Sequence, residues 1–357
     1  MLFLSSNNDT HLESEYIKYL AKYGKSYASK QEHQKRFQAF KDNYQLIEQH
    51  NSQENVPFLM AINHFSDLTS EEFESIFIQN GIKYARKVKP FTEQEVSEIE
   101  SKIHVLRDNP LPQSVNWYKN GKVSRPYNQG SCGSCWAFSA AAAMESLAVM
   151  NGHDDTIQEY SVQQLLDCDQ DESGCGGGWM WNAFNYTKHN GIMKRRDYGR
   201  DYKAYKDSCL FNEAKIHFKP ESLGMVEQDR NVNLVLKQLV SLQPISIAMV
   251  AIGILANYHS GIVTEDYLKC SDPLREVNHG VLLVGYGTVQ EDDRVRGHHC
   301  HEYWIVRNSW GRDWGEEGFF RVCMDGVGAR DKPYGTCLIN KYATWPNLNG
   351  IVIEPTD

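Results

Sequence analysis

The stretch NQGSCGSCWAFS, residues 128–139, places two cysteines three positions apart, Cys132 and Cys135, beside Gln129 and Trp136. Such a pair can be a redox couple, two ligands of a metal ion, or one structural thiol beside one reactive thiol. Residues 134–150, SCWAFSAAAAMESLAVM, follow as a predicted helix rich in alanine, so Cys135 falls in its first turn. The dipole of that helix favours a thiolate there.

The redox and metal interpretations explain little else in the chain. A thioredoxin-like pair usually has its tryptophan before the first cysteine, whereas Trp136 follows the second. A zinc site would need a second pair of ligands, and the nearest candidate is HHCH, residues 298–301, in a polar stretch. Histidines clustered in a surface loop are more often solvated than bound to metal. We therefore expect no metal, no cofactor and a nucleophilic Cys135.

Length and composition indicate a globular protein of about two domains. The chain has 357 residues, of which 41% are hydrophobic and 23% charged. A net charge of −9 argues against a nucleic-acid partner, and no apolar run reaches the roughly 18 residues of a membrane span. We expect a monomer with neither nucleic acid nor membrane as partner.

Cysteine usage points to an oxidising compartment. All nine cysteines lie between Cys132 and Cys337, and an odd number leaves at least one thiol free. Sequons at Asn8 and Asn185 agree with secretion, although such triplets also arise by chance. The first residues, MLFLSSNND, contain an apolar run that is too short for a signal peptide. We expect the secretory pathway, with a lysosome, an acidic vacuole or the extracellular space as destination and the signal peptide not present in this chain.

Residues 1–108 are charged, poor in glycine and free of cysteine. Residues 30–51 predict one amphipathic helix, because Arg36, Phe40, Asn43 and Ile47 recur on one face. A shorter helix is expected over 12–23, and SDLTSEEFESIF predicts a third, capped by a hydroxyl residue. The charged stretch 83–107 is typical of an exposed connector.

From Leu111 onward glycine, tryptophan and cysteine become frequent. After the alanine-rich helix, candidate strands occupy 244–250, 279–287, 301–309 and 318–323. We therefore expect an α+β fold with a domain over 109–357, divided into a helical lobe (about 111–220) and a β lobe (about 221–346).

Three segments together resemble the papain family of cysteine proteases. QGSCGSCWAFS is similar to the active-site cysteine segment of that family, VNHGVLLVGYG to its histidine segment, and YWIVRNSWGRDWGEEGFF to its asparagine segment. The resemblance implies a two-lobe papain-like fold and an endopeptidase with Cys135 as nucleophile, His279 as base and Asn308 as the residue that orients the base. It also implies that Gln129 and the backbone N–H of Cys135 stabilise the oxyanion, and that Trp310 shields the His279–Asn308 hydrogen bond.

The front half resembles the propeptides of cathepsin L-like enzymes. The interspersed E-R-F-N-I-N pattern of that group is matched by Glu32, Arg36, Phe40, Asn43, Ile47 and Asn51. AINHFSD resembles the second propeptide motif, G-x-N-x-F-x-D, with Ala61 in place of its glycine. The resemblance implies a zymogen whose residues 1–108 are an inhibitory propeptide, with a tail that crosses the active site. We expect mild acid to loosen carboxylate-bearing contacts and permit cleavage between about 102 and 112.

The resemblance also implies disulfides and substrate contacts. The pairs Cys132–Cys175, Cys168–Cys209 and Cys270–Cys337 are those of the family, and we expect Cys300 and Cys323 to form a fourth. Peptide and protein substrates would contact Gly133, Gly177, Gly178, Trp179, Met180, Ala248, Val277, Asn278, Gly280, Trp310 and Tyr342.

Two of these positions depart from common family residues and sharpen the expectation. Tyr342 stands where a small residue is common, which predicts a shallower S2 pocket for a large apolar P2 side chain. Asn278 stands where aspartate is frequent, which predicts an altered pH profile. Two alternatives stay open at this point: a non-catalytic binding or inhibitor protein, and an exopeptidase whose cleft is blocked by residues 288–302 or by the tail NLNGIVIEPTD.

Overall fold

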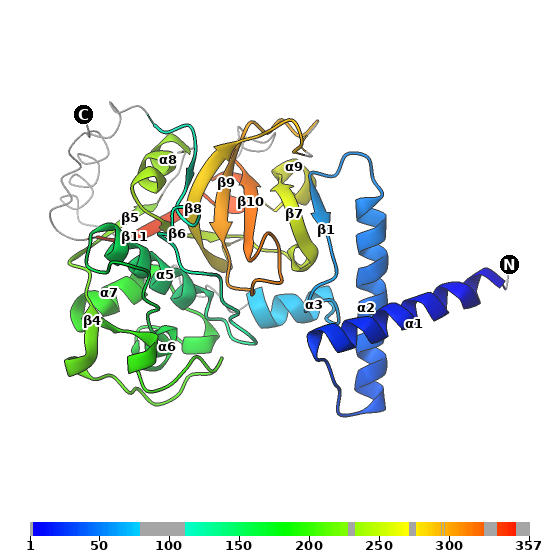
Figure 1. Cartoon of the computed structure of the whole chain (residues 1–357), viewed down its shortest axis with the longest axis horizontal. Helices are drawn as coiled ribbons and strands as arrows, with labels where there is room; N and C mark the ends of the chain where they lie inside the picture. Colours follow the sequence, from blue (N-terminus) through cyan, green and yellow to red (C-terminus); the bar gives the residue numbers. More distant parts are fainter. Residues whose placement is uncertain are drawn as a thin grey trace.

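The computed structural model describes residues 3–78, 111–227, 233–270, 276–293, 295, 297–324 and 334–347. Figure 1 shows a lobe of helices beside a lobe built on a twisted sheet, with the N-terminal helices against the outer edge of that sheet. The predicted α+β, two-lobe architecture with a helical propeptide is confirmed. Both the charged connector 83–107 and the expected cleavage segment lie outside the described residues, as does the C-terminal tail beyond 347.

The propeptide begins with two crossing helices, α1 (Phe3–Tyr23) and α2 (Lys30–Asn51). Helix α2 has the predicted bounds, and the Ser29 side chain caps it by accepting from the Glu32 N–H. Helix α1 begins closer to the N-terminus than expected. The helices cross through a cluster of buried aromatic rings, Tyr16, Tyr19 and Phe40.

The third propeptide helix, α3 (Ser70–Phe73), continues directly into a π-helical turn, η1 (Glu74–Ile78). Thr69 and Glu72 form a complete capping box at its start, which satisfies two backbone N–H groups that a helix N-terminus leaves free. The predicted cap is therefore present.

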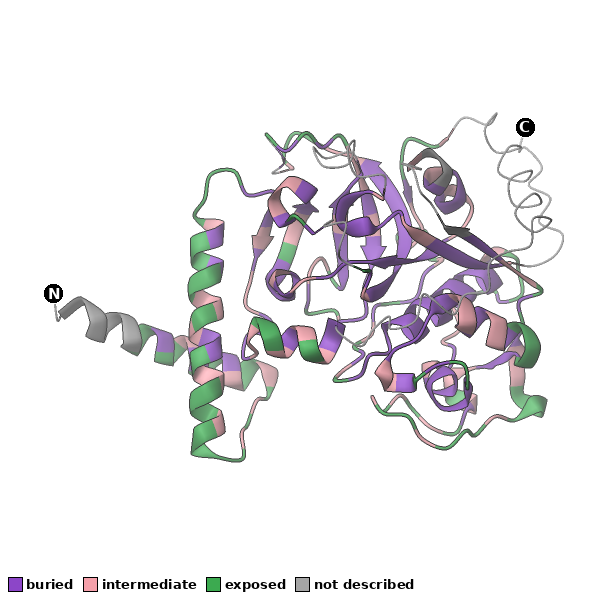
Figure 2. Ribbon diagram, turned by 180° about the vertical axis from the view of Figure 1, so that it is seen from behind, coloured by how far each residue is buried: buried purple, intermediate pink, exposed green. Residues whose placement is uncertain are grey.

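The helical lobe surrounds α5 (Cys135–Met150), whose residues are buried from Cys135 through Val149. Figure 2 shows this helix and the sheet as mostly buried, whereas the propeptide helices expose their outer faces. The lobe also contains α6 (Val162–Cys168), α7 (Met180–Asn190) and a small sheet of β3 (Ile192–Met193) with β4 (Ile216–Phe218).

The large sheet of the β lobe runs in the order β1-β7-β10-β9-β8-β6-β11-β5, with β2 also paired to β8. Its strands are β1 (Phe58–Met60), β2 (Val115–Asn116), β5 (Ser222–Glu227), β6 (Ile245–Met249), β7 (Tyr258–Val263), β8 (His279–Thr288), β9 (Glu302–Arg307), β10 (Phe319–Cys323) and β11 (Tyr342–Asn347). The four strands predicted from sequence are β6, β8, β9 and β10. Shorter elements are η3 (Gly174–Gly176), η4 (Arg195–Asp197), η5 (Glu213–Lys215), α8 (Asn233–Leu242), η6 (Gly253–Asn257), α9 (Glu265–Leu268) and η7 (Thr336–Leu338).

The propeptide extends this sheet through its own strand. β1 pairs antiparallel with β7, with Phe58 opposite Gly261 and Leu59 opposite Ser260. Around this strand the Asn63 side chain donates to the Ala256 carbonyl at 2.7 Å. The propeptide is therefore held by backbone pairing as well as by side chains, a mode of peptide recognition known as strand addition.

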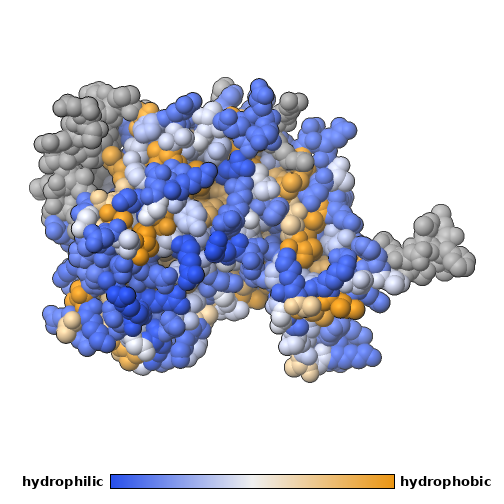
Figure 3. All heavy atoms as spheres, in the orientation of Figure 1, coloured by the Kyte–Doolittle hydropathy of each residue, from blue (hydrophilic) through white to orange (hydrophobic). Residues whose placement is uncertain are grey.

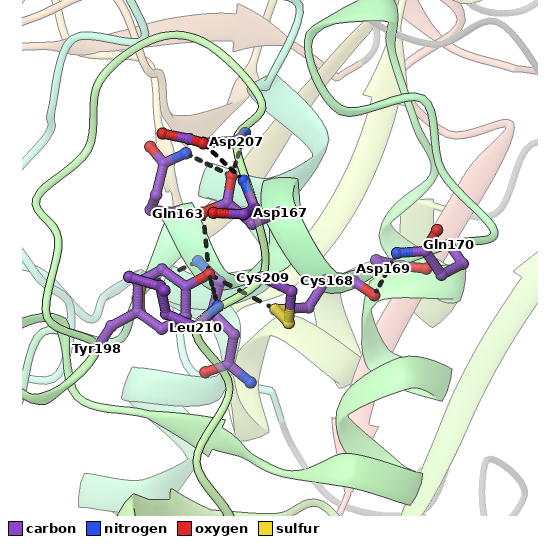
Figure 4. The surroundings of a disulfide bond; sticks show 12 residues. Gln163, Asp167, Cys168, Asp169, Gln170, Tyr198, Asp207, Cys209 and Leu210 are labelled. Carbon is purple, nitrogen blue, oxygen red and sulfur yellow. Dashed lines mark hydrogen bonds between the residues drawn. A yellow bond between two sulfur atoms is a disulfide. The ribbon is translucent and has the colours of Figure 1, made fainter.

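The structure forms four disulfides, Cys132–Cys175, Cys168–Cys209, Cys270–Cys337 and Cys300–Cys323, and leaves Cys135 free. Figure 4 shows the second of these, where Asp167 accepts from the Tyr198 hydroxyl at 2.9 Å and from the Asp207 N–H at 2.7 Å. These bonds hold the loop that contains Cys209 against α6.

The insertion around 288–302 is anchored by Cys300–Cys323 and reaches the propeptide. His298 Nδ1 lies 2.7 Å from Asp266 Oδ2, and its Nε2 lies 2.7 Å from the Asn55 carbonyl. At His298 the insertion therefore faces the outer, propeptide-bearing side of the β lobe.

The surface in the orientation of Figure 1 is mostly hydrophilic, with apolar patches on the propeptide helices (Figure 3). Exposed apolar side chains on those helices include Ile17 and Leu46. Among the described helices, none combines the length and apolar character needed to cross a bilayer.

Candidate active site

Cys135 lies at the first residue of α5, where the helix packs against β8. Its side chain is completely buried. The Gly280 N–H donates to its Sγ at 3.3 Å, so the second residue of β8 contacts the sulfur directly. The fold thus joins a helix N-terminus from one lobe to the start of a strand from the other.

His279 is the first residue of β8, and its imidazole lies among groups from the segment that follows β9. Its Nε2 lies 2.8 Å from Asn308 Oδ1, just beyond the end of β9. Trp310 stacks on the imidazole with ring centroids 4.9 Å apart, and Trp314 packs edge-on against Trp310. Within the described part of the chain, the Nδ1 of His279 is buried without a hydrogen-bond partner.

Burial determines the protonation of this pair in the intact chain. It raises the pKa of the Cys135 thiol to about 11, against the opposing effect of the N–H groups of Gly280, Trp136 and Cys135 itself. It lowers the pKa of His279 to about 4, although the Asn308 hydrogen bond acts in the other direction. Thiol and imidazole are therefore both neutral near pH 7, because a charged form would lose its hydration.

Gln129 is oriented by three groups that sequence reasoning missed or left unassigned. Its Nε2 donates to the Cys132 carbonyl at 2.9 Å, and its Oε1 accepts from the Ser309 hydroxyl at 2.6 Å. Tyr202 Oη donates to the Gln129 carbonyl at 2.5 Å and lies 2.6 Å from Ser134 Oγ. Ser309 directly follows Asn308, which is a local signal, whereas nothing in the sequence connects Tyr202 to this loop.

Three residues expected to contact substrate form a row across adjacent strands. Tyr342 of β11 lies opposite Ala248 of β6, which in turn lies opposite Gly280 of β8. Trp179 packs edge-to-face against Tyr342 with centroids 5.2 Å apart. The structure thus brings residues from three separate segments into one wall.

Glycine is required at positions beside this wall because other groups approach the backbone closely. A Cβ at Gly178 would lie 2.6 Å from the Trp136 ring, and one at Gly280 would lie 2.9 Å from Met180 Sδ. Gly177 has a φ of +104°, which other residues rarely adopt. Gly133 donates its N–H to the Cys175 carbonyl at 3.1 Å, next to the Cys132–Cys175 disulfide.

Asn278 is engaged by the backbone at the end of β6. Its Oδ1 accepts from the Ala251 N–H at 2.7 Å, and its Nδ2 donates to the Ala251 carbonyl at 2.9 Å. An aspartate could make only the first of these bonds. The neighbouring Val277 is buried. The amide therefore serves to fix the segment that precedes His279, a structural role that its position in the sequence did not indicate.

Propeptide aromatic side chains pack directly against the tryptophan that covers His279. The ring centroid of Phe73 lies 5.0 Å from that of Trp310, and that of Phe65 lies 6.2 Å away. His64 Nε2 lies 3.4 Å from Asn128 Nδ2, one residue before Gln129. The described part of the propeptide thus contacts two residues beside the catalytic constellation, Trp310 and Asn128.

Comparisons with known proteins agree with this geometry. Residues 111–346 match the model of the papain family cysteine proteases, and residues 16–73 match the cathepsin propeptide inhibitor domain. Among curated relatives, the probable cysteine protease RDL3 of Arabidopsis thaliana is 33% identical, over 99% of this chain and 88% of the relative. The senescence-specific cysteine protease SAG12 of the same plant is 33% identical, over 96% of this chain and 92% of its own length.

Solved zymogens share the whole arrangement. Digestive procathepsin L 3 of Tenebrio molitor superposes with a TM-score of 0.75 at 30% identity, covering 94% of this chain and 99% of its own. The stem bromelain precursor gives a TM-score of 0.75 at 30% identity, with coverage of 95% and 99%. The chain therefore belongs to the papain family of cysteine proteases and is made as a zymogen with an inhibitory propeptide.

Proposed function

We propose that the chain is an endopeptidase in which Cys135 is the nucleophile, His279 the general base, and Asn308 the group that orients the base. The single observation that carries this assignment is the convergence of Cys135 Sγ, the Gly280 N–H and the His279–Asn308 hydrogen bond at the contact of α5 with β8. A nucleophile beside a base that is oriented by a third group is the pattern of nucleophilic acyl transfer.

The chemistry proceeds in two steps once the cleft admits water and substrate. Hydration removes the penalty that keeps the pair neutral, so a proton passes from Cys135 to His279 and the thiolate attacks the peptide carbonyl. His279 then protonates the leaving amine, and water attacks the resulting thioester with His279 again acting as base. The pair would be neutral in the intact chain and an ion pair in the open cleft. Burial itself would therefore restrain activity.

Gln129 and the Cys135 N–H are proposed as the donors to the oxyanion. The Oε1 of Gln129 is held by Ser309 and one hydrogen of its Nε2 by the Cys132 carbonyl, so the second hydrogen is available in a fixed direction. A donor oriented before the reaction begins costs no reorganisation in the transition state. One such donor contributes about 3 kcal/mol to lowering the barrier in comparable sites.

Substrate selection is proposed to rest on the wall formed by Tyr342, Ala248 and Gly280, with Trp179 and Met180 beside it. These side chains are apolar apart from one phenol, which favours a large apolar P2 residue. The Tyr342 ring occupies part of this space and packs on Trp179, so a flat or unbranched P2 side chain should fit better than a branched one.

The propeptide is proposed to inhibit in cis and to leave after mild acidification, with cleavage between about 102 and 112. We further propose a division at residues 108 and 109, a monomeric state, and delivery to a lysosome, an acidic vacuole or the extracellular space. The four disulfides and the relatives support a secretory or vacuolar route. The contact of His298 with Asn55 supports an endopeptidase, because it turns this part of the insertion toward the propeptide side of the β lobe.

The test is intact mass and peptidase activity before and after mild acidification under reducing conditions, with an active-site epoxide added in parallel. A loss of about 105–110 residues from the N-terminus, new activity, and one epoxide adduct on Cys135 are expected. A Cys135→Ser chain serves as matched control and should neither cleave substrate nor form an adduct. A shortened wild-type chain that does neither would instead indicate a non-catalytic binding protein.

A further inference from the structure

We propose that His153, Asp154 and His217 form a binding site for one divalent transition-metal ion, with Zn²⁺ the best fit, on the helical lobe. Each of the three offers a ligand atom, and these atoms lie within 4.8 Å of one another. Two imidazoles and one carboxylate are donors that Zn²⁺ and its neighbours in the first transition row prefer.

The His217–Asp154 pair needs little rearrangement to accept an ion, whereas His153 Nε2 now donates to the His217 carbonyl at 2.9 Å, so His153 would bind through Nδ1 or give up that bond. His217 Nε2 lies 2.8 Å from Asp154 Oδ1 and 3.1 Å from Oδ2, and the His153 and His217 rings are 5.1 Å apart. A tetrahedral ion with bonds of about 2.0–2.1 Å holds its ligand atoms about 3.3 Å apart. The ion would replace the proton that His217 and Asp154 now share, and these two atoms would separate by about half an ångström.

The ligands lie on backbone that is already fixed. The N–H groups of His153 and Asp154 both donate to the Ala148 carbonyl, at 2.9 and 3.2 Å, at the end of α5. His217 lies at the centre of β4, which pairs with β3. Tyr160 Oη donates to Asp154 Oδ2 at 3.0 Å and thereby orients the carboxylate. Such outer hydrogen bonds are typical of built metal sites.

Charge and exposure also fit an ion of this class. The site lies just beyond the C-terminus of α5, where the helix dipole favours a cation. His153 is exposed and can admit the ion, whereas Asp154 is buried. Hard ions such as Mg²⁺ and Ca²⁺, which take mainly oxygen ligands, fit poorly because the cluster supplies only one carboxylate.

This cluster is independent of the proposed catalytic chemistry. Cys135 begins α5 and the cluster follows its last residue, Met150, so about 24 Å of helix separates them. Asp154 and His217 are 63 positions apart in the sequence, which is why sequence reasoning predicted no metal. The small β3–β4 sheet and the end of α5 bring the three ligands together only in the folded lobe.

The experiment uses the full chain with Cys135→Ser, so that the catalytic thiol cannot bind the metal. Calorimetric titration with Zn²⁺ should give one bound equivalent, and titration with Co²⁺ should give the strong visible absorption of a tetrahedral complex. The same chain with His153→Gln or Asp154→Asn should bind at least about tenfold more weakly. His189→Gln, which removes another exposed histidine of the same lobe, should bind like the parent, and Mg²⁺ should not compete.

Equal Zn²⁺ affinity in the parent and in both the His153→Gln and Asp154→Asn chains would overturn the proposal, and so would an equal loss in His189→Gln. The absence of any bound equivalent in the parent would overturn it as well. His153 is exposed, so its replacement keeps the test valid even if the chain with Asp154→Asn, at a buried position, fails to fold.

Discussion

Two buried polar clusters of this chain differ in charge: the cluster in the propeptide is ionised, and the cluster in the cleft is neutral. In the propeptide, burial alone would raise the pKa of Asp67, but its partners outweigh that effect and the pKa lies below its usual value. Lys25 Nζ lies 2.9 and 3.0 Å from the two carboxylate oxygens, and the hydroxyls of Tyr19 and Tyr27 each donate at 2.7 Å. In the cleft, Cys135 and His279 are buried as deeply but have only uncharged partners, and burial keeps both neutral.

The difference teaches that the charge and strength of the partners, rather than depth, decide which buried group stays charged. A carboxylate with three donors keeps its charge and acts as a fixed element of the propeptide core. A thiol that has only uncharged backbone N–H groups as partners, and an imidazole with one uncharged side-chain partner, lose theirs until water enters. The same rule therefore gives the zymogen a propeptide core that keeps its charged contacts and a catalytic pair that stays uncharged while it is covered.

The largest expected effect comes from breaking the charged cluster with Asp67→Asn. An amide cannot neutralise Lys25, whose side chain is only 25% exposed. Removing one member of a buried pair typically costs 3–5 kcal/mol, and the partial exposure of Lys25 reduces this to about 3 kcal/mol, or roughly 150-fold in the docking equilibrium. Urea unfolding in a Cys135→Ser background should show the loss. Asp42→Asn, at an exposed carboxylate of α2, is the control, and an equal effect in both chains would contradict the prediction.

The neutral state of the cleft predicts slow alkylation of Cys135 in the intact chain. A thiol pKa raised to about 11 leaves about a hundredfold less thiolate than an ordinary thiol has at the same pH. Iodoacetamide should therefore label Cys135 at least about a hundredfold faster after the propeptide is removed. In the intact chain the rate should rise about tenfold per pH unit toward pH 11. Mass spectrometry of timed samples measures the comparison before and after shortening at pH 6 and the rise of the rate over a series of pH values, and equal rates before and after shortening would refute the neutral pair.

The sequence predicted those features whose signal is local. Helix α2 follows from a periodic face and a serine cap, and the segments around Cys135, His279 and Asn308 carry their own residue patterns. The pairing of β1 with β7 had no such signal, because it joins three residues to a strand about 200 positions away. The bonds from Ser309 and Tyr202 to Gln129 span 180 and 73 positions; the first joins the two lobes and the second joins distant segments of the helical lobe.

A third prediction removes the one side-chain hydrogen-bond partner that His279 has among the described residues. Asn308→Ala leaves the imidazole free to rotate in the open cleft, so the productive orientation becomes less populated. We expect kcat of the shortened enzyme to fall about 10- to 100-fold with little change in KM, because peptide binding does not involve Asn308. Asn190→Ala, at an exposed asparagine of α7, should match the parent. A raised KM with unchanged kcat would indicate that Asn308 binds substrate instead.

His64 combines features of both clusters, and we expect it to determine how docking of the propeptide responds to acid. Burial lowers its pKa to about 4, with Lys25 acting in the same direction and Asp313 and Asp67 opposing. Its neighbours are the rings of Phe65 and Tyr23 and the amide of Asn128. When the docked pKa lies below the free value of 6.5, the stabilisation is complete above pH 6.5 and is lost as the pH falls toward 4. Asp67 and Glu72, whose pKa values are lowered, stay ionised through this window.

We therefore expect histidine rather than carboxylate contacts to weaken first in mild acid, which revises the sequence-based expectation. At pH 5.5 an undocked His64 gains about 1.4 kcal/mol by taking up a proton, about tenfold in the docking equilibrium. His64→Phe removes this response and should move the pH midpoint of propeptide loss lower by roughly half a unit to one unit, with docking at pH 7 nearly unchanged. His50, whose pKa burial also lowers, supplies the remaining response. The rate of chain shortening against pH measures the shift, and the exposed His11→Phe should leave it in place; an unchanged midpoint in His64→Phe would return the acid response to the carboxylates.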